Sequence, residues 1–276
     1  MTSPLVPGVP IRAEATVRAL HGEGGVNHRL VLRVPGWPGF LAGQFVMLSP
    51  GPLGAAPRTD PLLPRPMAVY RERASDGDPE IEILFKRHGR GTALLADCRP
   101  GARVGLVGPL GRGFPAVAAP RALLVAGGTG IASVYELAAR LLRRDASGVT
   151  VLLGARSAQD LMGEGDFAAL GVRLEIATED GSRGTRGLVT DLLEAALAQG
   201  APAHVYACGP TAMMRRCAEI ASARGAGCSV SLENPMACGF GVCLGCAAPL
   251  RSGAFALVCR DGPVFDASAV DWERMP

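Results

Sequence analysis

Four cysteines toward the C-terminal end place the tightest constraint on how this chain can fold. Three of them fall within nine residues, in the segment Cys238-Gly-Phe-Gly-Val-Cys243-Leu-Gly-Cys246, and the fourth, Cys259, follows after twelve more residues. Glycines stand between these thiols at positions 239, 241 and 245. A loop that turns several backbone N–H groups toward one centre needs positive φ angles, which glycine adopts at little cost. The segment therefore predicts a tight loop that presents its thiols to a common centre.

The order C-x4-C-x2-C followed by a distant cysteine is the spacing with which plant-type ferredoxins hold a [2Fe–2S] cluster. A structural zinc site more often uses two separate C-x2-4-C pairs or adds histidine, whereas here no histidine lies near the thiols. Disulfides need an oxidising compartment, and the N-terminal residues show no basic-then-apolar signal. The spacing favours an iron–sulfur cluster over zinc, disulfides or buried free cysteines. The expected ligands are Cys238, Cys243, Cys246 and Cys259.

The composition limits the partners that we expect. The net charge is only +3 and no basic run exceeds two residues, which argues against a nucleic-acid partner. No apolar stretch approaches the roughly 18 residues that span a bilayer, so we expect no membrane insertion. Eight cysteines without a secretory signal indicate the reducing cytoplasm. At 276 residues, the chain suits two domains and a small appendage.

From Ile11 to about Pro115 the pattern is that of an all-β domain. Short runs rich in β-branched or apolar residues alternate with Gly/Pro clusters, which predicts a sandwich or a small barrel. The runs are Ala13–Leu20, Arg29–Val34, Gln44–Leu48, Met67–Arg71, Glu80–Lys86 and Arg103–Val107. The proline-rich segment 50–64 has no periodicity, and we expect a loop there.

From Arg121 onward, candidate strands alternate with amphipathic helices, which predicts a parallel, doubly wound sheet. The candidate strands are Ala122–Ala126, Val149–Leu153, Arg173–Thr178 and His204–Ala207. The candidate helices are Ser133–Arg144, Gly187–Leu197 and Thr211–Arg224. A break at Gly225–Gly227 precedes the cysteine region. We therefore expect an N-terminal domain at 1–117, an α/β domain at 118–226 and a cluster domain at 227–276.

Two segments of the β region carry groups that can hold an anion. Arg65-Pro66-Met67-Ala68 begins a strand, where a proline is common and an arginine is often a solvated surface charge. The segment Lys86-Arg87-His88-Gly89-Arg90-Gly91-Thr92 opens a helix expected at Thr92–Asp97. Backbone N–H groups at a helix start, with basic side chains nearby, suit a dinucleotide pyrophosphate. A solvated turn is the alternative.

Two glycine turns follow strands of the α/β region. Gly127-Gly128-Thr129-Gly130 is not a complete G-x-G-x-x-G and lacks the Lys of a P-loop. Cys208-Gly209-Pro210 ends another strand. Both turns would lie at the same edge of the sheet, where such sheets bind nucleotides, so they could share one ligand. The alternatives are a plain tight turn and, for Cys208, a small buried apolar residue.

In this order, the pieces resemble the ferredoxin-NADP reductase superfamily, in which an antiparallel FAD-binding β-barrel precedes a nicotinamide-binding α/β domain. With its C-terminal cysteines, the chain is most similar to the electron-transfer subunits of class 1B dihydroorotate dehydrogenase. The similarity extends to residues 178–191, to the tail Cys259–Asp266, and to Val270 and Trp272. It covers nearly the whole chain.

The resemblance implies a role for each motif. Arg65 would hold the FAD pyrophosphate, and the isoalloxazine would lie beside Pro66, Met67 and Ala68. The flavin or its ribityl chain would contact Leu84, Phe85 and Lys86, and the phosphates would contact Gly91 and Thr92. The nicotinamide nucleotide would contact Gly127, Gly128, Thr129, Gly130, Cys208, Gly209 and Pro210. The family usually has Ser or Thr where Ala68 stands, so here only the backbone N–H is left for the flavin N5 region.

The same resemblance implies a function in pyrimidine (UMP) biosynthesis. Electrons would pass from an FMN-containing dihydroorotate dehydrogenase catalytic subunit through the [2Fe–2S] cluster and FAD to NAD+, within a heterotetramer of two copies of each subunit. Hydride transfer between nicotinamide C4 and flavin N5 needs no catalytic acid or base in this chain. We expect the apolar part of the cysteine loop, Phe240, Val242 and Leu244, to dock the partner, with burial under the cluster lobe as the alternative.

Two other functions fit parts of the pattern. With the same cofactors, the chain could serve a hydrogenase, a sulfite reductase or a ferredoxin:NADP oxidoreductase; the tail 262–266 and Trp272 favour dihydroorotate dehydrogenase. With zinc in place of iron, it would be a non-enzymatic nucleotide-binding module. Arg156-Ser157 follows a strand where related enzymes hold a 2′-phosphate, so NADP stays open although the resemblance favours NAD.

Overall fold

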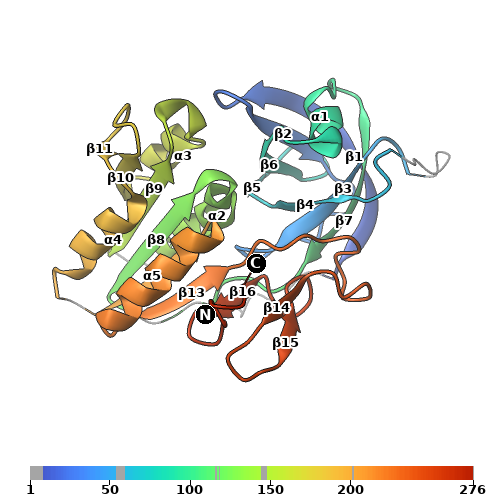
Figure 1. The fold of residues 1–276 in the computed structure, drawn as a ribbon. Coiled ribbons are helices and arrows are strands. Elements are labelled where there is room, and N and C mark those ends of the chain that lie inside the picture. The colour runs from blue at the N-terminus through green and yellow to red at the C-terminus, as the bar shows by residue number, and fades with distance from the viewer. Residues whose placement is uncertain are drawn as a thin grey trace.

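The computed structural model describes residues 9–53, 60–115, 117, 119–143, 148–200 and 202–275. Within these residues the chain forms two seven-stranded sheets and one two-stranded sheet. Figure 1 shows the two large sheets next to each other, with the C-terminal segment below their junction. Part of the segment 50–64, where a loop is expected, lies outside the described residues, at 54–59. None of the helices in the described ranges is long and apolar enough to cross a membrane.

The N-terminal sheet is antiparallel and curls into a half-barrel. In sheet order, its strands are β4 (Arg65–Ala68), β3 (Phe45–Pro50), β7 (Arg103–Leu110), β1 (Ile11–Gly22), β2 (Asn27–Arg33), β6 (Glu80–Lys86) and β5 (Arg71–Arg73). Buried residues of its longer strands, such as Leu30 and Leu32 of β2, fill its core. Helix α1 (Arg90–Ala96) follows β6. The predicted antiparallel β-domain is confirmed, and the predicted run Met67–Arg71 divides between β4 and β5.

The second sheet is parallel up to its last strand. In sheet order, its strands are β11 (Thr185–Arg186), β10 (Arg173–Thr178), β9 (Val149–Ala155), β8 (Arg121–Gly127), β12 (Ala203–Cys208), β13 (Gly227–Ser231) and β16 (Val264–Asp266). β16 runs antiparallel to β13. The strand order reverses between β8 and β12, and ligands bind at such a switch point in doubly wound sheets. The predicted parallel sheet is confirmed.

Helices cover both faces of this sheet (Figure 1). One face carries α4 (Val189–Leu197) and α5 (Thr211–Ala223), and the other carries α2 (Ile131–Leu142) and α3 (Glu164–Ala169). Leu193 and Ile220 are buried in the first layer, and Val134 is buried in the second. The short turns η1 (Gly128–Gly130) and η2 (Ala158–Asp160) follow β8 and β9. The loops that can hold a ligand therefore gather at one edge of the sheet.

The cysteine region is built into the junction of the two sheets. β13 and β16 flank it, so the parallel sheet continues past residue 226. Between them, β14 (Ala247–Pro249) and β15 (Phe255–Leu257) form a hairpin. A Cβ on Gly239 would lie 2.5 Å from Met47 Cγ of β3, and the backbone N–H of Arg112 donates to the Gly262 carbonyl at 2.6 Å. The cysteine region is therefore packed directly on the half-barrel.

Candidate functional site

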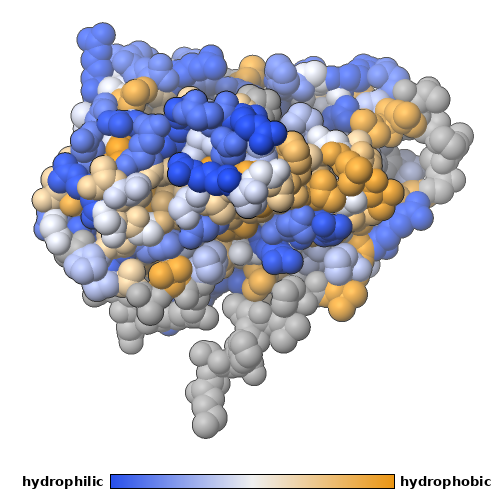
Figure 2. Space-filling view, turned by 60° about the horizontal axis from the view of Figure 1, so that its bottom comes forward, coloured by the Kyte–Doolittle hydropathy of each residue, from blue (hydrophilic) through white to orange (hydrophobic). Residues whose placement is uncertain are grey.

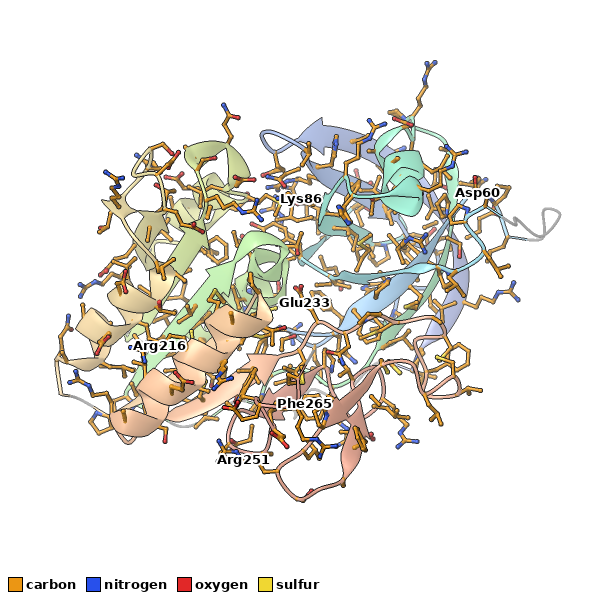
Figure 3. The ribbon with its side chains drawn as sticks, in the orientation of Figure 1. Asp60, Lys86, Arg216, Glu233, Arg251 and Phe265 are labelled. Carbon is orange, nitrogen blue, oxygen red and sulfur yellow. The ribbon has the colours of Figure 1, made fainter. Side chains whose placement is uncertain are left out.

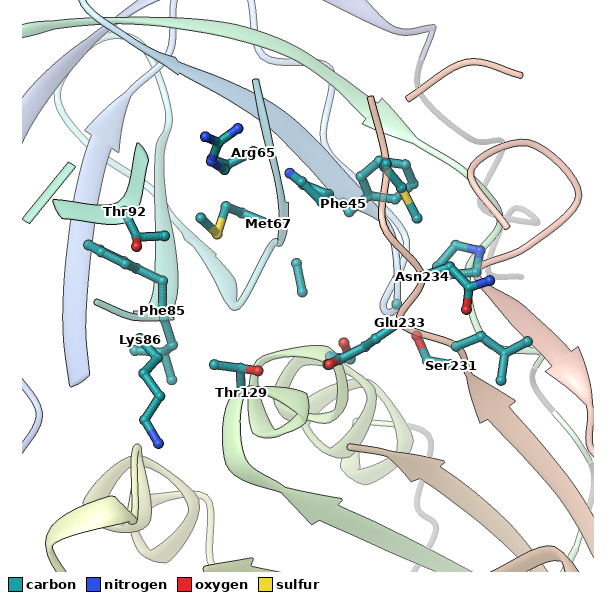
Figure 4. A pocket seen from close by; sticks show the side chains of 18 of the residues that line it. Phe45, Arg65, Met67, Phe85, Lys86, Thr92, Thr129, Ser231, Glu233 and Asn234 are labelled. Carbon is teal, nitrogen blue, oxygen red and sulfur yellow. The ribbon is translucent and has the colours of Figure 1, made fainter. Parts of the chain in front are cut away.

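A cavity of about 420 Å³ lies between the half-barrel and the parallel sheet (Figure 4). Most of the residues expected at the flavin line its half-barrel wall, namely Arg65, Pro66, Met67, Ala68, Leu84, Phe85, Lys86 and Thr92. The opposite wall includes Thr129 and Ser133, and also Glu233 and Met236 from the segment after β13. The fold thus brings three separate sequence motifs around one space.

Arg65 lies at one end of this cavity (Figure 4). Its Nη1 donates to the carbonyl oxygen of Leu63 at 2.7 Å. A Cβ on Gly91 would lie 2.2 Å from Arg65 Nε, so Gly91 provides the space that the guanidinium occupies. The Thr92 hydroxyl donates to the His88 carbonyl at 2.7 Å and holds the turn before α1. This cationic end suits an anion such as a pyrophosphate.

The middle of the half-barrel wall is apolar. Leu84 and Phe85 are 2% and 1% exposed, and the ring of Phe85 stacks on His28 with centroids 5.4 Å apart. Met67 lies between Arg65 and Phe85 in Figure 4 and offers a polarisable sulfur. Ala68 brings a methyl group and no hydroxyl to the same wall. Such a surface suits a planar aromatic ring.

A second cavity, of about 500 Å³, lies over the carboxyl edge of the parallel sheet. Four of the residues expected at the nicotinamide nucleotide line it, namely Gly127, Gly128, Thr129 and Pro210. Arg156 after β9 and Glu179 after β10 add one charge of each sign to its lining. This is the edge at which doubly wound sheets bind nucleotides.

Gly130, Cys208 and Gly209 bring the two glycine turns together instead of lining this cavity. A Cβ on Gly130 would lie 2.3 Å from the Cys208 carbonyl oxygen. Gly209 has a φ of 152°, and a Cβ there would lie 3.0 Å from the Gly127 carbonyl oxygen. Glycine at these positions lets the turns after β8 and β12 pack side by side.

The two cavities share a wall. Lys86, Thr129 and Glu233 border both of them. Lys86 and Glu233 lie at the junction of the two sheets in Figure 3. Lys86 Nζ is 3.3 Å from Oδ1 of Asp160, which belongs to the parallel-sheet domain. Ligands in the two cavities would meet at this wall, as a hydride donor and its acceptor must.

A carboxyl group stands at this shared wall, and a buried thiol lies behind it. Cys208 is 1% exposed, with its Sγ 3.9 Å from Glu233 Oε1. Burial raises the pKa of the Cys208 thiol to about 12, so the thiol stays neutral and is no nucleophile. Burial also raises the pKa of Glu233, although its side chain is open to the cavity. Neither the buried thiol nor the carboxyl group of raised pKa is an activated base.

Two of the four expected cluster ligands form a buried pair. The Sγ atoms of Cys246 and Cys259 are 3.3 Å apart, and both residues are 2% exposed. Burial and the neighbouring Cys246 sulfur together raise the pKa of Cys259 to about 12. Two thiolates this close repel each other, so both ionise readily only with a cation between them. Sulfur ligands of this kind are those that iron–sulfur clusters use.

The other two expected ligands lie on the preceding loop, with Cys238 partly buried and Cys243 exposed. Burial acts to raise the pKa of Cys238, but backbone N–H groups of Cys243, Phe240 and Val242 lower it to about 6. Backbone donors of this kind also stabilise cluster sulfurs. Among the described residues, no three His, Cys, Asp or Glu side chains converge on a single-ion site. A binuclear cluster needs only two thiolates at each iron. The Cys246–Cys259 pair is suited to supply the two thiolates of one iron.

The loop glycines follow the expectation in part. Gly239 and Gly241 have φ angles of 85° and 86°, as a loop that turns its N–H groups inward requires. At the third position the expectation is wrong: Leu244, with a φ of 60°, takes the left-handed conformation in place of Gly245. The side chain of Leu244 points outward and is 63% exposed.

Comparison with known proteins matches the same parts of the chain. Residues 233–271 match the iron–sulfur cluster binding domain of dihydroorotate dehydrogenase B, and residues 124–219 match an oxidoreductase NAD-binding domain. The dihydroorotate dehydrogenase B (NAD(+)), electron transfer subunit of Bacillus caldolyticus is 42% identical over 233 residues, 83% of this chain and 86% of that protein. The subunit of the same name from Geobacillus thermodenitrificans is 43% identical over 241 residues, 83% of this chain and 90% of that protein. The chain belongs to this family.

Solved structures agree with this membership in the electron transfer subunit family. The NADH-dependent reduced ferredoxin-NADP oxidoreductase, described for flavin-based electron bifurcation, superposes with a TM-score of 0.80 and 26% identity, covering 99% of this chain and 93% of that chain. The resemblance that the sequence predicts is therefore confirmed. The chain is an oxidoreductase subunit with FAD, iron–sulfur and NAD as its cofactors.

Among the cavity residues that the sequence did not predict, Glu233 stands out in this family member. Glu233 borders both cavities. It is positioned there because it follows the end of β13, a strand that the sequence pattern does not predict. A signal was present in the sequence, because Glu233 is the only charged residue between Arg224 and Arg251. A single carboxylate in an otherwise uncharged segment just before the cysteines is distinctive.

Proposed function

We propose that this chain is the electron transfer subunit of an NAD-dependent dihydroorotate dehydrogenase in pyrimidine (UMP) biosynthesis. The observation that carries the proposal is the arrangement around one junction, where two cavities share a wall and the cysteine region packs on the same half-barrel. We place FAD in the first cavity and NAD+ in the second. Bound there, FAD and NAD+ exchange a hydride, and the [2Fe–2S] cluster exchanges single electrons with FAD.

The half-barrel residues bind FAD in two ways, through a charged group at one end and through an apolar wall in the middle. Arg65, with Gly91 packed beneath it, holds the pyrophosphate, and Thr92 fixes the adjoining turn. The isoalloxazine lies against the apolar wall formed by Pro66, Met67, Ala68, Leu84 and Phe85, with Lys86 at its edge. Phe85 and Leu84 are buried, so this part of the wall is held in place by packing.

The two glycine turns hold the nicotinamide nucleotide. Gly127, Gly128 and Thr129 bring backbone close to the ligand, and Pro210 closes the opposite side. Gly130 and Gly209 act indirectly, by letting the turns approach each other, and Cys208 packs behind them. Hydride transfer needs no general base, so the neutral Cys208 and the raised pKa of Glu233 suit a lining that positions the ring and excludes water.

We assign the cluster to Cys238, Cys243, Cys246 and Cys259, and the docking face to the loop that carries the first of them. Phe240, Val242 and Leu244 are 57%, 74% and 63% exposed, so in this chain they are not buried under the cluster lobe. Figure 2, which turns the bottom of the molecule forward, shows hydrophobic side chains gathered on this face. An exposed apolar loop beside an electron-transfer centre fits a protein partner better than solvent.

The relatives' name, electron transfer subunit, supports a second, catalytic subunit as this partner. We propose that it contains FMN, oxidises dihydroorotate and assembles with this chain as a heterotetramer of two copies each. Four cluster thiols that must stay reduced before assembly favour the cytoplasm as the compartment.

A second candidate keeps the cofactors and changes the partner to a ferredoxin-like protein. The observation in its favour is the TM-score of 0.80 to the ferredoxin-NADP oxidoreductase structure. The identity of 42% to dihydroorotate dehydrogenase B subunits favours the first candidate over it.

Co-expression with an FMN-containing dihydroorotate dehydrogenase subunit, followed by anaerobic purification, tests the proposal. We expect one FAD and two irons with two acid-labile sulfides for each copy of this chain, and dihydroorotate-dependent reduction of NAD+ by the complex. Zinc in place of iron, or a complex that lacks FAD, would overturn it. Reduction of a ferredoxin by NADH, with no response to dihydroorotate, would establish the second candidate instead.

A further inference from the structure

Asp166 in α3 joins the parallel-sheet domain to the half-barrel. Its Oδ2 accepts hydrogen bonds from Arg29 Nη2 at 2.6 Å and from the Tyr70 hydroxyl at 3.0 Å, and its Oδ1 accepts one from Arg71 Nη1 at 2.8 Å. All three donors belong to the half-barrel, Arg29 on β2, Arg71 on β5, and Tyr70 just before β5. One carboxylate therefore ties three points of the neighbouring domain.

The half-barrel side of this contact has more cations than anions. Glu82, whose side chain is 1% exposed, pairs with three guanidiniums, those of Arg29, Arg71 and Arg73. Glu23 pairs with Arg29 as the second carboxylate. Asp166 supplies the third, from the other domain. The side chains of Arg29 and Arg71 are each 11% exposed, so water cannot easily replace this carboxylate, and a buried ion pair that loses one partner is costly.

The charges in this contact are present at neutral pH. Burial acts to raise the pKa of Asp166, but the hydrogen bond and charge of Arg29, and the charge of Arg71, hold it below its ordinary range. Burial raises the pKa of Tyr70, so its hydroxyl stays protonated and donates. The Tyr70 ring packs on Tyr135 of α2 with centroids 4.5 Å apart, which adds an apolar contact between the domains.

The segment 159–166 connects this contact to the second cavity. Asp160 lines that cavity and pairs with Lys86, which borders both cavities. Asn27 Nδ2 donates to the Asp160 carbonyl at 3.3 Å, and the backbone N–H of Gly163 donates to Glu23 at 3.2 Å. In Figure 1, α3 lies beside the end of the half-barrel that carries β2 and β6. The whole segment is therefore held against the half-barrel at the edge of the shared wall.

We propose that Asp166 is a positioning residue for hydride transfer: it fixes the angle at which the parallel-sheet domain meets the half-barrel. The proposal rests on the function proposed above, in which the two ligands react across the shared wall. Hydride transfer requires reacting atoms about 3–3.5 Å apart, and a displacement of about 1 Å costs on the order of 10²-fold in rate. Asp166 lines neither cavity, so its effect passes through the segment 159–166.

Single-turnover reduction of the bound FAD by NADH, followed by stopped-flow absorbance on the cofactor-loaded protein, tests this role. Asp166→Asn removes the charge but keeps the shape. We expect the limiting rate of FAD reduction to fall at least about tenfold, while the NADH concentration for half-maximal rate changes less than about threefold. Asp166→Glu, which keeps the charge on a longer side chain, should recover part of the rate.

Two further variants separate positioning from folding. Tyr70→Phe removes one hydrogen bond and leaves the ring contact, and should slow FAD reduction by about 2–10-fold. Glu164→Gln lies on the same helix but its partner, Arg183, belongs to the same domain, so its rate should equal that of the wild type. FAD and iron content are measured for every variant.

The outcomes decide between two failures. If the wild type does not pass electrons from NADH to FAD, the proposed function fails. If it does, and Asp166→Asn matches it, the positioning role fails. If Asp166→Asn loses FAD or does not fold, Tyr70→Phe decides, and a wild-type rate in that variant overturns the role. An equal slowing by Glu164→Gln would also overturn it, because the effect would then belong to the helix and not to the contact between domains.

Discussion

Glu233 stands where the two cavities meet, in a stretch of chain that is otherwise uncharged from 225 to 250. Its neighbour Cys208 is a neutral thiol and offers it no compensating positive charge. A carboxyl group in such surroundings takes up a proton more readily than one in water. The protonation of this one side chain therefore links the pH of the solution to the wall that the two cavities share.

Glu233→Gln is expected to stabilise the protein more as pH rises. Burial raises the pKa of Glu233 in the folded state, whereas the unfolded chain releases this proton near the ordinary value of about 4.3. Between the two values the folded state binds more protons, so wild-type stability falls as pH rises, and the loss is complete above the folded pKa. Glutamine does not titrate. Melting temperatures of both proteins from pH 5 to pH 8.5 should diverge in favour of the variant.

A constant difference across that pH range would show that Glu233 titrates like a surface carboxylate. Glu219→Gln is the matched control, because Glu219 is 48% exposed on α5 and pairs with Arg215 on the surface. Its melting temperature should stay close to that of the wild type at every pH.

Gly91→Ala is expected to weaken FAD binding without weakening the fold. The added Cβ would lie 2.2 Å from Arg65 Nε, so the guanidinium must leave the position in which it faces the cavity. Alanine is the better helix former by about 1 kcal/mol, so α1 itself should not suffer. Loss of a charged hydrogen bond of about 1.5–3 kcal/mol corresponds to roughly 10–150-fold in affinity. FAD fluorescence titration of the apoprotein measures it.

Gly165→Ala in α3 is the control for this substitution, since a Cβ there meets nothing within 4 Å. It should bind FAD as the wild type does. If Gly91→Ala also binds FAD normally, Arg65 is not the group that holds the pyrophosphate.

At the scale of elements, periodicity predicted the strands that alternate buried and exposed residues and the helices with an apolar face. Glu80–Lys86 and Arg173–Thr178 have the predicted bounds. β13 was missed because Gly227–Ser231 contains one large apolar residue, and only pairing with β12 and β16 makes it a strand. α3 was missed because its six residues include a glycine and too few turns to show a period. Glu233 comes just after β13 and Asp166 lies in α3. Without these two elements, the sequence could not place either residue in space.

Val242→Asp in the cysteine loop is expected to weaken binding of the catalytic partner without loss of FAD or iron. Val242 is 74% exposed on the face proposed for docking, so a charge there stays in water in the free chain but would be buried in an interface. A cost of about 2 kcal/mol corresponds to roughly 30-fold in affinity. Surface plasmon resonance between the two purified subunits measures it.

Val26→Asp is the matched control, since Val26 is 48% exposed at the β1–β2 turn, on the half-barrel. Normal binding by this variant and weak binding by Val242→Asp would support the docking face. Equal binding by both would move the interface away from the cysteine loop.

For the whole molecule, the three sites form a series because the cysteine region packs on the half-barrel and the half-barrel meets the parallel sheet. Phe45, Met47 and Leu110 of the half-barrel share one apolar core with Cys246 and Cys259. Phe45 also lines the first cavity, so the buried cysteine pair and the lining of this cavity are joined by continuous packing. The second cavity lies on the far side of the shared wall. In the function that we propose, electrons from a partner at the cysteine loop reach NAD+ by way of the first cavity.

Cys246→Ser is expected to stop electron transfer from the partner to FAD and to leave the reaction between NADH and FAD intact. The variant should lose the cluster, because the buried thiol pair is broken, and its complex with the partner should lose more than about 90% of dihydroorotate-dependent NAD+ reduction. Reduction of FAD by NADH alone should stay within about threefold of the wild type, since neither cavity is lined by Cys246. Cys228→Ala, a buried cysteine outside the loop, should retain both activities. Wild-type NAD+ reduction in a Cys246→Ser complex shown to be free of iron would mean that electrons reach FAD without the cluster, and the series would be wrong.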